Sequence, residues 1–247
     1  MHCDANAIEV TDLSFRYPDG TQALDSVSFL IEHGRRVALL GPNGAGKSTL
    51  ISHLNGITLA QSGTVAIEDV PITDETVHEV RTRVGVVFQD PDNMLFMTNI
   101  GDDIAFGPLN MRLSADEVAR RVDVVLEAMG ISELRDKPGM HISYGQKKRA
   151  ALAAVLAMEP AVLVLDEPTS NLDPRAKREM TDLVSGLDIT LMIATHDMDL
   201  AWAMCDTALV LDEGRVVAHG PARQIMSDED LMVSHGLEVP FAARKLV

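Results

Sequence analysis

The chain has 247 residues, 46% of them hydrophobic, which is enough apolar material for one large domain with a packed core. Its formal net charge is −16, so we expect no nucleic-acid partner, because a phosphate backbone attracts lysine and arginine. The two cysteines, Cys3 and Cys205, are too few for a disulfide framework and favour a reducing compartment. No stretch has the pattern of a signal peptide or the ~18 clean apolar residues of a membrane-spanning helix.

The first part of the chain reads mainly as strands. Alternating apolar residues within 8–31 predict antiparallel strands around the turn Tyr17-Pro18-Asp19-Gly20. A helix is expected at Thr49–Leu54. Further short strands are predicted at Val37–Leu40, Thr64–Ile67 and Val84–Phe88.

The middle of the chain reads mainly as helices. Residues 90–110 are predicted to be irregular, because glycine and proline recur in them. A helix is then predicted from Ser114, which would form a capping box with Glu117, to Gly130. A second helix is expected from about Ser143 to Met158.

The last third alternates strands and helices again. Val162–Leu165 and Ile189–Ala194 are continuous apolar runs, typical of strands that are buried on both faces. Asp173-Pro174 is expected to start a helix between them, with the aspartate as cap and the proline at the first position. A hairpin is predicted around Asp212-Glu213-Gly214, and short helices follow Pro221.

This order predicts an α/β fold with a mostly parallel sheet, an antiparallel β subdomain at the N-terminus and an inserted α-helical subdomain. We expect a single domain over 1–247. Its core would comprise about 1–89 and 159–247, and its helical subdomain about 90–158.

A complete phosphate-loop motif is the most informative feature of the sequence. Residues 41–48 read Gly-Pro-Asn-Gly-Ala-Gly-Lys-Ser, and they lie between a predicted strand and a predicted helix, as this motif requires. Backbone N–H groups in such a loop surround phosphate oxygens, and the helix dipole adds to the attraction. Lys47 would reach the β- and γ-phosphates of ATP, and Ser48 would hold Mg²⁺. The expected ATP-binding residues here are Gly41, Pro42, Asn43, Gly44, Ala45, Gly46, Lys47, Ser48 and Thr49.

Two carboxylates follow the buried strand Val162–Leu165. The end of a strand beside a phosphate loop is where a second Mg²⁺ contact belongs, and Asp166 is the better candidate for it. Glu167 is then the candidate general base that polarises the attacking water. The alternative is a solvated acidic turn.

The segment Ile142-Ser143-Tyr144-Gly145-Gln146 precedes a predicted helix. Ser143 would cap that helix, and the exposed N–H groups of its first turn could bind an anion. The alternative is a capped helix without a ligand. The next three residues, Lys147-Lys148-Arg149, are predicted to form a solvated basic face.

Together these motifs resemble the ATP-binding-cassette (ABC) ATPases over nearly the whole chain. Residues 142–146 resemble the signature of that family, usually Leu-Ser-Gly-Gly-Gln, and Asn171-Leu172-Asp173 resembles its D-loop. Gln89 stands where its glutamine loop falls, His196 resembles its switch histidine, and Tyr17 resembles the aromatic residue that stacks on adenine.

The resemblance implies the P-loop NTPase fold of ABC ATPases, with ATP as substrate and Mg²⁺ as cofactor. It also implies two cassettes paired head to tail, either two copies of this chain or this chain and a paralogue. His196 would hold the γ-phosphate, and Gln89 would contact Mg²⁺ and link the site to a transport partner. The residues that would act in trans are Ser143, Gly145, Gln146 and Asp173.

Tyr144 departs from the family pattern, which usually has glycine there. If the position required a positive φ, tyrosine would cost about 1–2 kcal/mol. In the first turn of a helix the cost is small. We favour the helical interpretation because Ser143 can serve as the cap, and we expect a competent site with Tyr144 beside the nucleotide or the partner.

Residues 86–111 resemble more narrowly the ATPase subunits of energy-coupling-factor importers, especially those of cobalt and nickel uptake, and 17–21 and 155–160 do so too. This implies an ATP-hydrolysing subunit held peripherally on the cytoplasmic face of the cell membrane, docked to a membrane subunit through about 90–108. The apolar contacts would be Met94, Leu95, Phe96 and Met97, with internal packing as the alternative interpretation of these four.

A soluble ABC ATPase that assembles or remodels another protein is the alternative function. It would share all the nucleotide chemistry and differ in the surface of residues 90–108. A nucleotide-regulated adaptor with negligible hydrolysis is disfavoured by Glu167 and His196.

Overall fold

The computed structural model describes residues 6–244, which divide into two compact units. Unit 1 contains Ala161–Asp166 and the described parts of Met1–Val84 and Asp188–Val247. Unit 2 contains Gly85–Pro160 and Glu167–Leu187, so it includes the range 90–158 and takes up a later segment as well. Of the two cysteines, Cys205 is buried as a free thiol, and Cys3 lies outside the described residues.

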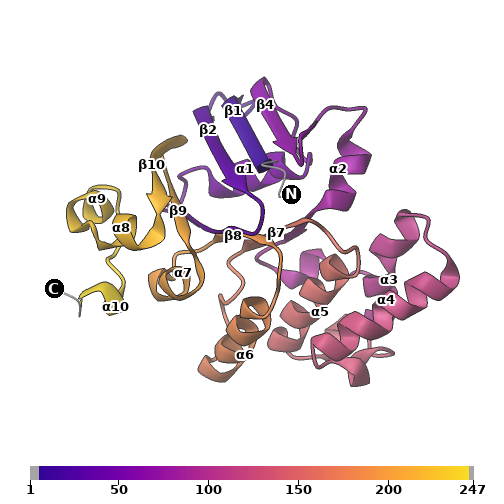
Figure 1. The fold of residues 1–247 in the computed structure, drawn as a ribbon. Coiled ribbons are helices and arrows are strands. Elements are labelled where there is room, and N and C mark those ends of the chain that lie inside the picture. The colour runs from indigo at the N-terminus through magenta and orange to yellow at the C-terminus, as the bar shows by residue number, and fades with distance from the viewer. Residues whose placement is uncertain (1–5, 245–247) are drawn as a thin grey trace, which may run out of the picture. The chain divides into compact units, whose positions relative to one another are not determined.

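Unit 1 contains an antiparallel sheet near the N-terminus, as the sequence predicts. Its strand order is β2-β1-β4-β5, and Figure 1 shows β1, β2 and β4 side by side. Buried and exposed residues alternate along most of β2, because successive side chains of a strand point to opposite faces. The strands are β1 (Asn6–Arg16), β2 (Gln22–Glu32), β4 (Ser62–Ile67) and β5 (Val70–Pro71).

A second sheet has the strand order β10-β9-β3-β8-β7-β6. Strands β7, β8, β3 and β9 pair in parallel, and β10 pairs antiparallel with β9 in the predicted hairpin. The mostly parallel sheet is therefore confirmed. Its strands are β3 (Arg36–Leu40), β6 (Val84–Val87), β7 (Val162–Asp166), β8 (Thr190–Ala194), β9 (Thr207–Asp212) and β10 (Arg215–Pro221).

The helices of unit 1 are short. The predicted short helices of the tail are confirmed. Within the described residues, no helix combines the length and the hydropathy that crossing a bilayer requires. These helices are α1 (Lys47–Leu54), α2 (Val77–Arg83), α7 (Met198–Met204), α8 (Ala222–Ser227), α9 (Glu229–Ser234) and α10 (Phe241–Arg244).

Unit 2 is built from helices. Its three longest helices before residue 160 pack on one another (Figure 1). Val118, Val122 and Leu126 recur along α4 and are all buried, as residues at this spacing lie on one face of a helix. The helices are α3 (Ile100–Asn110), α4 (Ala115–Ala128), α5 (Tyr144–Leu156) and α6 (Pro174–Ser185). Single 3₁₀ turns occur at Pro91–Asn93, Ser132–Leu134 and Gly139–His141.

The prediction that residues 90–110 are irregular is wrong for Ile100–Asn110, which forms the helix α3. Asn99 caps this helix by accepting a hydrogen bond from the Asp102 N–H at 2.9 Å. Gly107 serves close packing rather than a turn, since a Cβ there would lie 2.6 Å from Cγ of Met158. Pro108 is tolerated near the end of the helix, where one lost hydrogen bond matters less.

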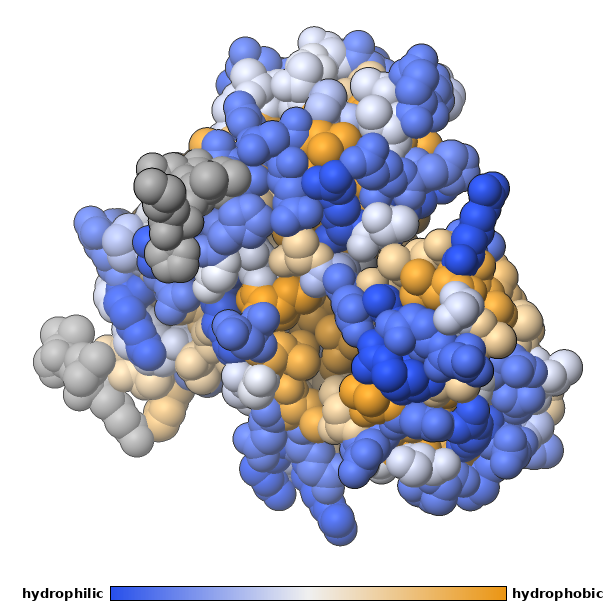
Figure 2. All heavy atoms as spheres, turned by 45° about the vertical axis from the view of Figure 1, so that its right-hand side comes forward, coloured by the Kyte–Doolittle hydropathy of each residue, from blue (hydrophilic) through white to orange (hydrophobic). Residues whose placement is uncertain are grey.

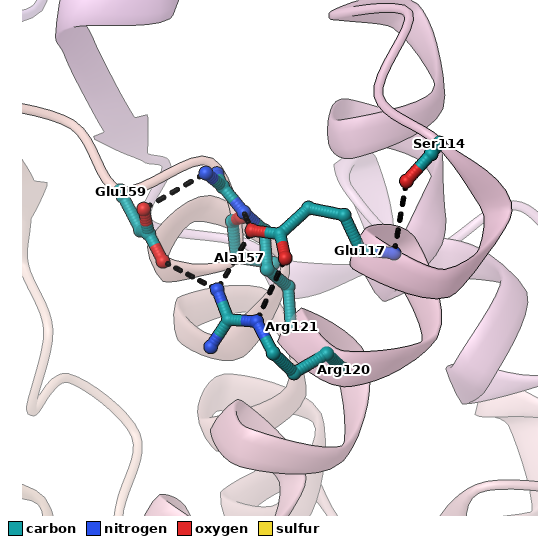
Figure 3. Close-up of polar contacts among 6 residues, drawn as sticks. All are labelled: Ser114, Glu117, Arg120, Arg121, Ala157 and Glu159. Atoms are coloured by element: carbon teal, nitrogen blue, oxygen red, sulfur yellow. Dashed lines mark hydrogen bonds and ion pairs between the residues drawn. The ribbon is translucent and has the colours of Figure 1, made fainter.

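The capping box predicted at Ser114 is only half formed. Ser114 accepts a hydrogen bond from the Glu117 N–H at 3.3 Å, but the Glu117 carboxylate turns to Arg120 and Arg121 instead (Figure 3). A complete box forms at α5 between Ser143 and Gln146. The Gln146 N–H donates to Oγ of Ser143, and the Ser143 N–H donates to Oε1 of Gln146.

Candidate nucleotide-binding site

The phosphate loop of unit 1 joins β3 to α1, and its backbone admits only glycine at two positions. Gly41 has φ 153°, and a Cβ there would lie 2.1 Å from the carbonyl oxygen of Leu211. Gly46 has φ 103°, and its Cβ would lie 2.5 Å from the carbonyl oxygen of Ala23. A side chain at either glycine would therefore clash with neighbouring backbone, so the loop requires glycine at both positions.

Lys47 begins α1 and points back over the loop. Its ammonium donates to the carbonyl oxygens of Gly41 at 2.6 Å and Pro42 at 2.9 Å, so the positive charge lies within the loop. Gly46 precedes the helix and has no side chain with which to cap it. The amino end of the helix and the ammonium together form a site for an anion.

The turn of the β9–β10 hairpin supports this loop from outside the motif. The Gly214 N–H donates to the Ala45 carbonyl at 3.0 Å, and the Gly214 carbonyl accepts from the Asp25 N–H at 2.8 Å. The sequence predicts the hairpin but not this role, because the partners are far apart in the chain. The only sequence signal was the glycine itself, which has φ 76° here.

Tyr17 directly follows β1, and both its hydroxyl and its ring are held by neighbouring side chains. Its hydroxyl shares a hydrogen bond of 2.9 Å with Oγ1 of Thr49 on α1. Its ring meets that of Phe15 edge to face, with centroids 5.1 Å apart. Thr49 is thus held by Tyr17 rather than exposed at the loop, while the Tyr17 ring stays partly exposed.

The register of the parallel strands brings the ends of β7 and β8 to the same edge as the phosphate loop. Ala194, the last residue of β8, pairs with Leu39 of β3 on one side and with Asp166 of β7 on the other. Because the carboxyl ends of parallel strands share one edge, Asp166 and the residues after Ala194 lie where the loop begins.

His196 follows β8 at this edge and is exposed. The residues on either side of it are anchored. The Asp197 N–H donates to Oγ1 of Thr195 at 3.0 Å, and the Asp197 carboxylate caps α7 through the Leu200 N–H at 3.1 Å. The imidazole is therefore presented from a fixed backbone.

The donor set at this edge fits magnesium. Ser48 offers an exposed hydroxyl at the amino end of α1, and Asp166 offers a carboxylate at the end of β7. Both are hard oxygen ligands, which Mg²⁺ prefers, and few protein ligands suffice because the ion keeps several waters and phosphate oxygens.

The other predicted site residues belong to unit 2. Gln89 follows β6 and is exposed, and Glu167 directly follows Asp166 and is buried. Asp173 caps α6 by accepting from the N–H groups of Ala176 and Arg175, and these hydrogen bonds lower the pKa of its carboxyl group. The remaining members, Ser143, Gly145 and Gln146, form the start of α5.

Tyr144 occupies the first position of α5 and has no positive φ, which confirms the helical interpretation of this residue. The predicted solvated basic face is wrong for Lys148, which is 1% exposed. Its neighbour Lys147 forms an ion pair of 2.6 Å with Asp92. Of these two lysines, Lys148 is therefore buried and Lys147 pairs with an acidic side chain of the same unit.

The segment proposed for docking has two kinds of apolar residue. Met94 is only partly exposed, and its sulfur accepts from the Phe88 N–H at 3.4 Å. Phe96, by contrast, is 61% exposed, and its ring meets that of Phe106 edge to face with centroids 5.0 Å apart. Met97 and Leu109 are exposed as well. In Figure 2 hydrophobic residues reach the surface beside strongly hydrophilic ones.

A complete phosphate loop at the carboxyl edge of a mostly parallel sheet defines a P-loop nucleoside-triphosphate-binding protein. A family model described as ABC transporter matches residues 24–170. The chain belongs to this family and is an ABC ATPase, the ATP-binding subunit of a transporter.

Individual relatives match over nearly the whole chain. The energy-coupling factor transporter ATP-binding protein EcfA of Carboxydothermus hydrogenoformans is 47% identical over 241 residues, 96% of this chain and 89% of that protein. The EcfA protein of Methanocaldococcus jannaschii is 43% identical, over 96% of this chain and 86% of that protein. The structure of cbiO1 from Clostridium perfringens, part of the ABC transporter complex cbiONQ, superposes with a TM-score of 0.82 at 40% identity, covering 98% and 99% of the two chains.

Proposed function

We propose that this chain is the ATP-hydrolysing motor of an energy-coupling-factor importer, and that cobalt or nickel is the cargo of the complex. The importer type is supported by the EcfA relatives and by the likeness to cbiO1, both nearly full-length. The cargo rests on the sequence of residues 86–111. The chain works as one domain, with the core near 1–89 and 159–247 and the helical subdomain near 90–158.

The phosphate loop would hold the triphosphate through its N–H groups and the Lys47 ammonium, which would turn from the loop carbonyls to the β- and γ-phosphates. Ser48 and Asp166 would hold Mg²⁺ with a contact from Gln89, and the bound ion would draw charge from the phosphate oxygens. Tyr17 would stack on the adenine ring. The remaining contacts would come from Gly41, Pro42, Asn43, Gly44, Ala45 and Gly46, and from Thr49, whose hydroxyl is hydrogen-bonded to Tyr17.

Hydrolysis needs a water in line with the γ-phosphate and a group that accepts its proton. Glu167 would be this base, because it directly follows the metal-binding strand end. His196 would donate a hydrogen bond to the γ-phosphate and stabilise the charge that develops there. The bond from the γ-phosphorus to the bridging oxygen breaks as the water oxygen attacks.

Each site would be completed by a second ATPase subunit, either a copy of this chain or a paralogue. The complete capping box of α5 supports this role, because it fixes a helix start that can face the γ-phosphate across a dimer. The residues contributed in trans would be Ser143, Gly145, Gln146 and Asp173.

The exposed pair Phe96–Phe106 is the observation that supports docking to a membrane subunit. Two exposed phenylalanine rings in contact form an apolar surface on an otherwise acidic chain, and such a surface fits an apolar partner segment. Residues near 90–108 would bind the membrane subunit and hold the chain peripherally on the cytoplasmic face of the cell membrane.

Co-purification from membranes tests the docking. Phe96→Asp should release the chain from its membrane partner while ATP binding stays at the wild-type level, because a charge in an apolar contact is costly. Val233→Asp, at an exposed position of α9 in unit 1, is the matched control and should still co-purify. Capture of Phe96→Asp in full amount would contradict the docking surface, whereas a wild-type chain that captures no membrane subunit would favour the soluble alternative.

Substitution of the base tests the hydrolytic role. Glu167→Gln should lower kcat about 10²–10⁴-fold, the range expected for loss of a general base, while ATP remains bound. Single-turnover hydrolysis and retained nucleotide are the measurements. Turnover at the wild-type rate in this variant would remove Glu167 as the base.

A further inference from the structure

Lys148 is a buried cation in the middle of α5, five residues after Ser143. Only 1% of its surface is exposed. Its ammonium donates to the carbonyl oxygen of Glu167 at 2.8 Å and to Oγ of Ser170 at 3.4 Å. Burying an ammonium is costly unless it is hydrogen-bonded. The function of a buried lysine is therefore to be sought at the group that accepts its hydrogen bonds.

The carbonyl oxygen of Glu167 is the focus of several donors. Besides Lys148, it accepts from Oγ of Ser170 at 2.9 Å and from the Ser170 N–H at 3.2 Å. Glu167 itself has φ 48°, in the left-handed region that disfavours side chains by about 1–2 kcal/mol. Such a conformation persists only where the surroundings enforce it, and here the hydrogen bonds on the carbonyl do so.

Lys148 also connects this carbonyl to the signature segment. Its ammonium lies 5.9 Å from the ring centroid of Tyr144, four residues earlier on the same helix. Residues four apart share one face of a helix, so the contact follows from the local geometry. One side chain therefore contacts both the residue that departs from the family signature and the main chain of Glu167.

We propose that Lys148 is a positioning residue for ATP hydrolysis. Its ammonium holds the Glu167 main chain in the left-handed conformation and so sets the direction of the Glu167 carboxylate. Because Lys148 belongs to α5, the same contact makes that direction depend on the position of the signature helix. The inference rests on the proposed role of Glu167 as general base.

Lys148→Met is the first variant, because methionine has a similar length and suits a buried position but donates no hydrogen bond. Two donors from Ser170 remain on the carbonyl, so the chain should fold. We expect kcat to fall about tenfold to hundredfold, as for a misplaced catalytic group, with nucleotide affinity unchanged. Lys137→Met, which removes an exposed lysine of unit 2, is the control and should keep the wild-type kcat.

Two further variants cover the case in which Lys148→Met does not fold. Lys148→Gln retains a donor without the charge and should recover part of the lost kcat. Ser170→Ala removes a different donor from the same carbonyl and should lower kcat in the same way but by less.

The Glu167→Gln background separates positioning from a structural role. Provided that two copies of this chain pair, Lys148→Met added to Glu167→Gln should leave their ATP-dependent dimer intact, measured by light scattering, because the carboxylate that Lys148 positions is already gone. Loss of that dimer would overturn the proposal. So would a folded Lys148→Met with the wild-type kcat. Full turnover by Glu167→Gln alone would instead overturn the proposed base.

Discussion

Asp103 lies buried beneath the exposed residues Phe96 and Met97. Its Oδ1 accepts from the N–H groups of these two residues at 2.8 and 2.9 Å. Its Oδ2 is buried without a hydrogen-bond partner within residues 6–244. Burial raises the pKa of this carboxyl group above its ordinary value of 3.8, although the two backbone hydrogen bonds act in the opposite direction.

The raised pKa gives a prediction about pH. The native state binds a proton at Asp103 more tightly than the unfolded state does, so this contribution to stability is full below pH 3.8 and is lost as pH rises through the native pKa. Asp103→Asn keeps one oxygen for the two N–H groups and does not titrate. The free energy of unfolding of the wild type should therefore fall relative to that of the variant as pH rises above 3.8 toward neutrality. Urea unfolding across this range measures it, and parallel pH curves would contradict it.

At the scale of elements, an arginine pair connects α4 to the residues that follow α5 (Figure 3). Arg121 binds the carboxylates of Glu117 and Glu159 and donates to the carbonyl of Ala157 at 3.2 Å. Arg120 binds the same two carboxylates from the solvent side. Hydrogen bonds from Arg120 and Arg121 lower the pKa of Glu117 from 4.5 to about 2. The stability that this carboxylate contributes is therefore full above pH 4.5 and is lost as pH falls through the native pKa of about 2.

The two arginines should differ in their effect on stability. The Arg121 side chain is 13% exposed and that of Arg120 is 54% exposed. Arg121→Met should lower the free energy of unfolding by about 1–3 kcal/mol, because it leaves a carbonyl and two carboxylates without that partner. Arg120→Met should change it by less than about 0.5 kcal/mol, as for an exposed pair. Urea unfolding of both variants compares them, and equal losses would show that burial does not decide the difference.

At the scale of the whole molecule, Gly145 offers a variant that spares the fold. A Cβ there would lie 3.4 Å from Cβ of Ala176 and 3.8 Å from Leu172, which are ordinary contacts. Gly145→Ala should therefore fold normally while placing a methyl group where the proposed dimer brings the nucleotide of the facing subunit.

Mixing two inactive variants tests the trans arrangement, provided that two copies of this chain pair. Lys47→Ala lacks a working phosphate loop, and Gly145→Ala lacks a working signature. Each alone should hydrolyse ATP at least about tenfold more slowly than the wild type. Their mixture should regain activity, because a mixed dimer contains one site with both parts intact. Titration of one variant into the other measures this recovery, and a mixture no better than its components would contradict trans sites.

Local patterns account for much of what the sequence revealed. The phosphate loop, the cap at Asp173 and the apolar strand Val162–Leu165 depend on residues within a few positions of one another. The helical position of Tyr144 was predictable for the same reason, since Ser143 can cap the helix from the adjacent position. The helix over residues 100–110 was not predictable, because its glycine and proline resemble loop signals. The close packing that explains Gly107 involves Met158, which is distant in the sequence.

By itself, the sequence determined the P-loop fold and the order of most of its elements, and it predicted the residues that carry ATP chemistry, because backbone preference and hydrogen bonding between near neighbours act locally. Only the tertiary structure decided that Lys148 is buried on the Glu167 carbonyl, that Gly214 supports the phosphate loop and that Phe96 is more exposed than Met94. Burial and close approach depend on segments that are distant in the chain. A lysine in a basic run therefore reads as solvated until the elements packed around it are known.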